Sequence, residues 1–346
     1  MKCPWLQGCI GGIALVKDGS QSYNDDMRIL FVSATRIGDA VLSTGVLSHL
    51  VDSYPGARIT VACGPAAASL FATVPGLDQV IILEKMIGSL HWLRLWGLTV
   101  WRFWDIVVDL RSAPLTYVLF ARKHYHLDKR KHKGHRLRQI AAVLKQESCP
   151  PFPKLWSHPD IDARAAKLIS RQRPTVAIGP TANWRAKTWR SENFSELCVR
   201  ITAPGGLIPG ANIAVFGAAE ERPQIIGLLE TISEKQCVDL VGRVSLLEAF
   251  ACLKRCSVYI GNDSGLMHIA AASGVPTLGV FGPSKEELYG PIGPLTASVR
   301  TPSSFDDIHP EGFDHKFSDS LMDGLTVDHV FEALSVLWSR AQELSH

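Results

Sequence analysis

The polar run at residues 261–268, Gly-Asn-Asp-Ser-Gly-Leu-Met-His, carries residue types that hold phosphorylated ligands. Ser264, Gly265 and the first N–H groups of the predicted helix are suited to bind a diphosphate, because a helix N-terminus carries free N–H groups and partial positive charge. Asp263 is suited to accept hydrogen bonds from a ribose or sugar hydroxyl. His268 follows Ser264 by one turn on the same face. The alternative is that Asp263 and Ser264 only cap the helix and that His268 is a core residue.

The turn at residues 35–39, Thr-Arg-Ile-Gly-Asp, comes directly before a predicted helix at residues 40–52. Gly38 allows the backbone to turn tightly. The carboxylate of Asp39 is suited to act as a general base that takes the proton from an attacking hydroxyl, and the alternative is a helix cap or dipole partner. No G-x-G-x-x-G motif follows the preceding strand, which argues against an NAD-dependent oxidoreductase.

Two further polar loops follow predicted strands in the second half of the chain. In residues 183–189, Asn-Trp-Arg-Ala-Lys-Thr-Trp, Lys187 or Arg185 is suited to neutralise charge on a phosphate leaving group, unless both cations are simply solvated. In residues 217–221, Gly-Ala-Ala-Glu-Glu, the carboxylates serve the helix dipole by default, and ribose binding is the functional alternative.

These loops are positioned by short Val- and Ile-rich runs that alternate with helical patterns, which is typical of βαβ units around a parallel sheet. The pattern occurs twice, and ligands bind beyond the carboxyl ends of the strands in such sheets. The sequence Ser245-Leu-Leu-Glu248 predicts a capping box, and the last helix is predicted from about residue 327. The strands are predicted at residues 28–34, 58–63, 79–83, 105–110, 175–179, 212–217, 238–241, 257–261 and 277–281.

The length of 346 residues exceeds what one hydrophobic core usually supports, and a proline-rich stretch interrupts the pattern near its middle. We therefore predict an α/β chain of two Rossmann-like domains. Its parts are an N-terminal extension at 1–26 that is expected to fray, a first domain at 27–150, a linker at 151–173, a second domain at 174–326 and a C-terminal helix at 327–346.

Composition excludes several classes of function. The balance of 36 basic and 33 acidic residues gives a net charge of only +3, so a dedicated nucleic-acid binder is not expected. The eight cysteines contain no C-x-x-C pair, so neither a zinc site nor a disulfide framework is indicated, and reduced thiols in the cytoplasm are expected. The apolar patch at residues 9–16 is too short to span a membrane.

Taken together, these motifs resemble glycosyltransferase family 9, the bacterial lipopolysaccharide heptosyltransferases, from residue 27 to about residue 336. The resemblance is carried by residues 28–47 with the Gly38-Asp39 turn, by Lys187 with Trp189, and by the run at 262–268. It implies a GT-B fold, in which two parallel sheets face a central cleft. It also implies an inverting, metal-independent transfer from an ADP-heptose co-substrate, without a cofactor, to an inner-core lipopolysaccharide acceptor.

The resemblance also implies individual roles. Asp39 would be the general base and Lys187 would contact the donor diphosphate. Donor-binding roles fall to Glu221 for the ribose and to Asp263, Ser264, Gly265 and His268. Acceptor-binding roles are assigned to Arg36, Gly38, Arg111 and Arg136. The D-x-D at residues 160–162 falls in the predicted linker, which argues against a metal-dependent transferase.

The expected partners are a nucleotide-sugar donor and an anionic lipid-linked glycan acceptor, with no nucleic acid. The basic segment at residues 122–138 would attract an acidic, phosphorylated lipid core, or it is only a solvated face. Trp92, Trp96, Trp101 and Trp104, among leucines and arginines, fit either a helix at a bilayer interface or core packing. The expected location is the cytoplasm, with peripheral contact at the inner face of the membrane as the interfacial interpretation.

Three alternative functions remain open at this stage. A transferase of the same family could use another nucleotide-sugar donor or another glycan acceptor. A sugar-nucleotide epimerase of similar architecture would need no lipid acceptor. A non-catalytic sugar-nucleotide or lipopolysaccharide binding protein would need no base, so Asp39 argues against it.

Overall fold

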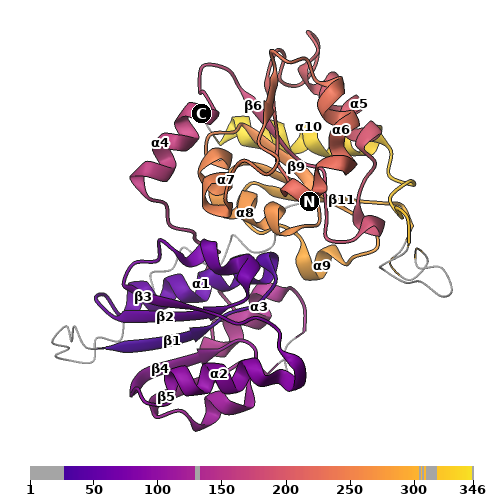
Figure 1. The fold of residues 1–346 in the computed structure, drawn as a ribbon. Helices are drawn as coiled ribbons and strands as arrows, with labels where there is room; N and C mark the ends of the chain where they lie inside the picture. The colour runs from indigo at the N-terminus through magenta and orange to yellow at the C-terminus, as the bar shows by residue number, and fades with distance from the viewer. Residues whose placement is uncertain (1–26, 129–132, 304, 306–307, 309–317, 345–346) are drawn as a thin grey trace. The chain divides into compact units, whose positions relative to one another are not determined.

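The computed structural model describes residues 27–128, 133–303, 305, 308 and 318–344. It divides the chain into two compact units, Met1–Trp156 and Ser157–His346, which we call unit 1 and unit 2. Each unit is a parallel sheet flanked by helices (Figure 1). The predictions for residues 1–26, and for the part of the basic segment at 129–132, lie outside the described residues.

Unit 1 is built on a five-stranded parallel sheet with the order β3-β2-β1-β4-β5. β1 lies at the centre, and its apolar residues are buried, as expected for a parallel strand covered on both faces. The strands are β1 (Arg28–Val32), β2 (Arg58–Cys63), β3 (Leu77–Ile82), β4 (Trp104–Asp109) and β5 (Ala121–His126). The helices are α1 (Ile37–Ser53), η1 (Pro65–Phe71), η2 (Ile87–Ser89), α2 (Leu90–Thr99), η3 (Pro114–Val118), α3 (Arg136–Ala141) and η4 (Ala142–Leu144).

Unit 2 is built on a six-stranded parallel sheet with the order β11-β10-β9-β6-β7-β8. The predicted capping box is confirmed, since Ser245 Oγ accepts from Glu248 N–H at 3.3 Å and Glu248 Oε2 accepts from Ser245 N–H at 2.7 Å. The strands are β6 (Thr175–Gly179), β7 (Asn212–Val215), β8 (Cys237–Asp239), β9 (Val258–Asn262), β10 (Thr277–Phe281) and β11 (Thr296–Arg300). The helices are α4 (Pro159–Leu168), η5 (Arg185–Lys187), α5 (Ser191–Thr202), η6 (Ala219–Glu221), α6 (Arg222–Thr231), α7 (Leu246–Leu253), α8 (Gly265–Ser273), α9 (Glu286–Tyr289) and α10 (Val327–Glu343).

Two strands were not predicted, and both lie at sheet edges. β5 occupies the start of the basic segment, and β11 pairs only with β10. An edge strand has one unpaired side and often carries charged residues, so it lacks the apolar signature of a central strand. The strand that includes the start of the basic segment, residues 122–126, was therefore missed in the sequence analysis.

The predicted linker at residues 151–173 is also not free of regular structure, because α4 lies within it. Pro159 stands in the first turn of α4, where its missing N–H costs no helical hydrogen bond. Asp160 and Asp162 stand in the same turn, where carboxylates favour the helix dipole. The D-x-D sequence therefore has a local structural explanation.

In each unit the first strand is a topological switch point. β1 lies between β2 and β4, and β6 lies between β7 and β9. The chain runs from β1 to β2 on one side and from β4 to β5 on the other, and likewise from β6 to β7 and from β9 to β10. The loops after these neighbouring strands therefore diverge beyond the carboxyl ends, which is where open α/β sheets bind ligands. The loops after β1 and β4, and those after β6 and β9, are therefore the places to examine for a site.

In the part of the chain that the structure describes, no helix is both long enough and apolar enough to cross a membrane. The thiols of Cys63, Cys198 and Cys252 are buried, and burial raises the pKa of each to about 12. These three cysteines are therefore core residues that stay protonated at neutral pH.

Candidate active site

A buried ion pair lies at the switch point of unit 2. Lys187, in the loop after β6, places its Nζ 2.5 Å from Oδ2 of Asp263, which directly follows β9. The same Nζ donates to the backbone oxygen of Asp263 at 3.2 Å. The two side chains are only 11% and 7% exposed. The ammonium group is therefore held in one position at the carboxyl edge of the sheet.

Asn262, the last residue of β9, fixes the loop that carries Lys187. Its side chain is fully buried. Its Oδ1 accepts from Trp189 N–H at 3.0 Å, and its Nδ2 donates to the oxygen of Pro180 at 2.7 Å. Asn262 thus ties β9 to the loop on both sides of Lys187. Asn262 belongs to the polar run at residues 261–268, but the sequence did not predict this role.

The N-terminus of α8 follows this pair directly. Ser264 is the N-cap residue, but its side chain makes no capping hydrogen bond, and Asp263 is engaged with Lys187. The interpretation that both residues only cap the helix is therefore wrong. Ser264 and Gly265 are partly exposed, whereas His268 is 4% exposed within the unit. The structure brings Ser264 and Gly265 together with Lys187, and it keeps His268 on the buried side of α8.

Glu221 lies after β7, next to the loop of β6. Its Oε2 accepts from Thr181 Oγ1 at 2.7 Å and from Ala218 N–H at 2.8 Å. Thr181 was not predicted to contribute to the site, because a single threonine after a strand gives no sequence signal. The two bonds hold the Glu221 carboxylate at the same sheet edge as Lys187.

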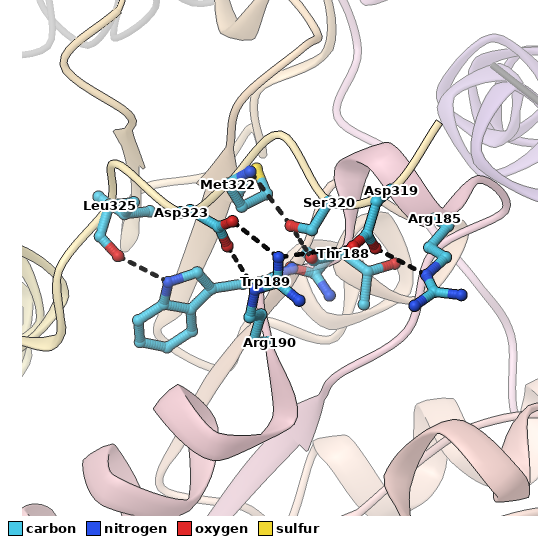
Figure 2. A network of polar contacts seen from close by, with 10 residues as sticks. Arg185, Thr188, Trp189, Arg190, Asp319, Ser320, Met322, Asp323 and Leu325 are labelled. Atoms are coloured by element: carbon cyan, nitrogen blue, oxygen red, sulfur yellow. Dashed lines mark hydrogen bonds and ion pairs between the residues drawn. The ribbon is translucent and has the colours of Figure 1, made fainter. Parts of the chain in front are cut away.

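A network of polar contacts holds the Lys187 loop against the segment at residues 318–325 (Figure 2). Arg190 makes two hydrogen bonds to the Asp323 carboxylate, at 2.5 and 2.7 Å. Arg185 Nε lies 2.8 Å from Oδ1 of Asp319, so this cation is paired in the network rather than with Asp263. Uncharged bonds join Ser320 Oγ to Thr188 O, Leu321 N to Ala186 O and Trp189 Nε1 to Leu325 O at 2.8–3.0 Å.

At the switch point of unit 1, Asp39 forms an ion pair with Arg136. Arg136 Nε lies 3.1 Å from Oδ1 of Asp39, and the side chains are 15% and 20% exposed. Arg136 also donates from Nη1 to Gln139 Oε1 at 3.0 Å. Arg36 is the N-cap residue of α1, so Asp39 does not cap the helix, but it stands in the first turn, as the alternative of a dipole partner requires.

The other acceptor-binding residues predicted for this edge lie in the loops after β1 and β4. Arg36 is exposed, and Gly38 forms the start of α1. Arg111, which follows β4, donates from Nη1 to Thr35 Oγ1 at 3.3 Å and lies 5.6 Å from the centre of the Trp92 ring. This contact joins the loops after β1 and β4 across the switch point.

Asp109 was not predicted as a site residue, yet it holds the Arg111 loop. It is fully buried at the end of β4 and accepts from the backbone N–H groups of residues 111, 112 and 113 at 2.7–3.0 Å. Thr116 Oγ1 donates to it at 2.7 Å and also contacts His126 Nε2 at 3.0 Å. Burial lowers the pKa of His126, with Asp109 raising it and His124 lowering it further.

Within the described residues, no three or more His, Cys, Asp or Glu side chains gather as metal ligands. At the carboxyl edge of each sheet, a charged pair lies beside a helix N-terminus. Unit 2 offers a fixed cation, a helix N-terminus and a carboxylate, which suits a nucleoside diphosphate. Unit 1 offers the Asp39 carboxylate paired with Arg136, with an exposed Arg36 at the start of the same helix, which suits a hydroxyl-bearing acidic substrate.

Comparison with known proteins identifies the family of this chain. The family model of glycosyltransferase family 9 (heptosyltransferase) matches residues 107–306, more than half of the chain. The chain therefore belongs to this family and is a glycosyltransferase, and the predicted resemblance is confirmed.

Individual relatives match along most of the chain. It is 24% identical to lipopolysaccharide heptosyltransferase 2 of Salmonella typhimurium, over 90% of this chain and 99% of the relative. A glycosyltransferase family 9 structure from Veillonella parvula aligns with a TM-score of 0.74 at 20% identity, covering 93% of this chain and all of the other. The Escherichia coli ADP-heptose lipopolysaccharide heptosyltransferase II aligns with a TM-score of 0.71 at 21% identity, covering 91% and 100%. The predicted α/β GT-B fold class is thereby confirmed.

Proposed function

We propose that the chain transfers a heptose from ADP-heptose to an inner-core lipopolysaccharide acceptor by inverting displacement, without a metal. The names of the Salmonella and Escherichia coli relatives suggest this donor and acceptor. The observation that carries the proposal is the Lys187 ammonium, fixed by Asp263 beside the N-terminus of α8. A fixed cation beside helix N–H groups can stabilise a diphosphate leaving group without a metal ion.

The donor role falls to unit 2. As the bond between the sugar carbon C1 and the phosphate oxygen breaks, its electron pair stays on the departing ADP, whose negative charge grows. Lys187, Ser264 and the N–H of Gly265 would stabilise this charge, because donors that are already oriented need no reorganisation. Glu221 would accept a hydrogen bond from a ribose hydroxyl. The burial of His268 favours a role behind the helix rather than direct contact with the donor.

The acceptor role falls to unit 1. Asp39 would take the proton of the acceptor hydroxyl while that oxygen bonds to C1 from the side opposite ADP, which inverts the configuration at C1. Arg136 would orient the Asp39 carboxylate through the 3.1 Å ion pair, in addition to attracting the acceptor. Arg36 and Arg111, at the Gly38 turn and after β4, would bind acidic groups of the acceptor.

The cysteine content bears on the cellular location of the reaction. The eight cysteines form no disulfide pattern, and this supports assigning the reaction to the cytoplasm. The nucleotide-sugar donor would be a co-substrate, and no cofactor is proposed.

A thermal-shift panel with ADP, UDP, GDP, CMP and NAD, each with and without a chelator, tests the donor assignment. A ligand that binds the native state raises Tm by mass action, so we expect stabilisation by ADP alone, unchanged by the chelator. Selective stabilisation by UDP or GDP would assign another donor, and stabilisation by NAD alone would refute a transferase role. Incubation with ADP-heptose and truncated inner-core lipopolysaccharide acceptors with and without a first heptose, followed by NMR of the new linkage, then tests inversion directly.

A further inference from the structure

Tyr259, in β9, is one of the largest side chains that the chain buries completely. Its hydroxyl is buried as well, and among the described residues no group meets that oxygen at both the distance and the angle of a hydrogen bond. A hydroxyl that is removed from water without a full hydrogen bond destabilises the fold. A buried phenol in this position therefore calls for a functional explanation.

Three glycines make room for the phenol beneath α8. Gly179, Gly261 and Gly279 lie side by side on β6, β9 and β10, because Gly261 pairs with each of the other two. A Cβ atom at residue 179 or 261 would collide with the Tyr259 hydroxyl, and a Cβ atom at residue 279 would collide with the side chain of Met267 on α8. The hydroxyl thus fills the space over two glycines at the carboxyl ends of β6 and β9, directly under the switch point.

The surroundings of the hydroxyl connect it to the start of α8. Burial raises the pKa of the Tyr259 phenol, hydrogen bonding toward the Ser264 side chain opposes this rise, and the charge of Glu221 adds to it. The phenol therefore stays protonated at neutral pH and remains a donor. Ser264 is partly exposed and its side chain makes no capping hydrogen bond, so its oxygen is suited to receive the phenol proton.

We propose that Tyr259 is a positioning residue for the donor diphosphate, acting by donation of a hydrogen bond to Ser264 Oγ. A serine hydroxyl has one proton and two lone pairs. When the phenol occupies a lone pair, the serine proton is directed away from the sheet, toward the ligand at the N-terminus of α8. Two hydrogen bonds in series also polarise each other, which strengthens the bond to the phosphate. The proposal rests on the donor role proposed for unit 2 and adds a residue that does not itself touch the donor.

The substitution Tyr259→Phe tests the proposal, because it removes only the hydroxyl oxygen from a buried ring. We expect the Kd for ADP, measured by isothermal titration calorimetry, to rise about tenfold, as for a lost hydrogen bond to a charged group. The KM for the donor should rise with it, and the KM for the acceptor should not change. The Tm without nucleotide should stay the same or increase, because a poorly paired hydroxyl leaves the core. A tyrosine that only stabilised the core would show the reverse, a lower Tm with an unchanged Kd.

A double-mutant cycle tests whether Tyr259 acts through Ser264. Ser264→Ala should weaken ADP binding by itself, and adding Tyr259→Phe should have little further effect, because the phenol then has no serine to orient. Tyr54→Phe is the matched control. It removes a partly exposed phenol at the end of α1 in unit 1 and should leave the Kd for ADP unchanged.

Two results would overturn the positioning role alone: wild-type affinity for ADP in Tyr259→Phe, or a second tenfold loss when Tyr259→Phe is added to Ser264→Ala. If the wild type prefers UDP or GDP, the same titrations with that nucleotide apply, since the diphosphate is common to all three. Absence of binding to every nucleoside diphosphate would refute the donor role of unit 2 together with this proposal. That failure is seen in the wild type, so it is distinguishable from a failure of the positioning role.

Discussion

The two switch points carry equivalent loops on equivalent sheets, yet they are held very differently. In unit 2 the Lys187–Asp263 pair is 11% and 7% exposed, and both Asn262 and the segment at 318–325 fix its loop. In unit 1 buried Asp109 likewise fixes the backbone after β4, but the Asp39–Arg136 pair is 20% and 15% exposed, Arg36 is exposed, and the Arg111 side chain bonds an exposed Thr35 at 3.3 Å. A site that binds the same diphosphate at every turnover gains from fixed donors, whereas a large acidic acceptor is better met by accessible charge.

Asp39→Asn should give the largest effect, because it removes the proposed base while keeping the shape of the side chain. We expect turnover to fall about a hundredfold or more, with stabilisation by ADP unchanged. Asp52→Asn is the matched control, since Asp52 lies on the same helix with a side chain that is 63% exposed. Near wild-type turnover for Asp39→Asn would show that unit 1 supplies only binding.

Lys187→Met should affect both donor binding and stability. It leaves Asp263 buried without its cation, which typically costs about 3–5 kcal/mol, and we expect turnover to fall about a hundredfold with loss of the ADP thermal shift. Adding Asp263→Asn should restore most of the stability and none of the activity. Lys167→Met, at an exposed position of α4, is the control. Restored turnover in the double variant would mean that the pair is structural only.

Arg36→Gln combined with Arg111→Gln should act on the acceptor alone. We expect the KM for the acceptor to rise roughly tenfold at low salt and the difference to shrink as salt is added, because exposed charges are screened. The KM for the donor and the ADP thermal shift should stay at wild-type values. An equal rise in the KM for both substrates would contradict the division of labour between the units.

The sequence predicted the parts of these sites that follow apolar strands. Asp263 directly follows β9, and Asp39 and Lys187 lie in the segments that follow β1 and β6, where a parallel sheet binds ligands. Asp109 was hidden because it lies inside the run read as a strand at residues 105–110. Its four donors all lie within the next seven residues, but the sequence does not show that this loop folds back over the carboxylate.

Contacts between residues far apart in the sequence could not be predicted either. Arg190 and Asp323 are 133 residues apart, and the segment around Asp323 has no strong periodicity. His268 shows the opposite error, since helical spacing from Ser264 predicted a shared face but could not predict its 4% exposure. Side-chain burial is set by tertiary packing, which local spacing does not report.

The contact between Arg190 and Asp323 gives the smallest expected effect and the sharpest test of why unit 2 is rigid. The pair is bidentate but 42% and 58% exposed, and such pairs are worth up to about 1 kcal/mol, so Arg190→Ala should raise the KM for the donor about threefold with little change in kcat. Exchanging the charges, Arg190→Asp with Asp323→Arg, should restore part of the affinity. Arg200→Ala is the control, because Arg200 pairs with Asp328 at 2.6 Å in the same unit without touching the Lys187 loop. If both alanine variants change the KM equally, the network at residues 318–325 stabilises unit 2 as a whole and does not orient Lys187.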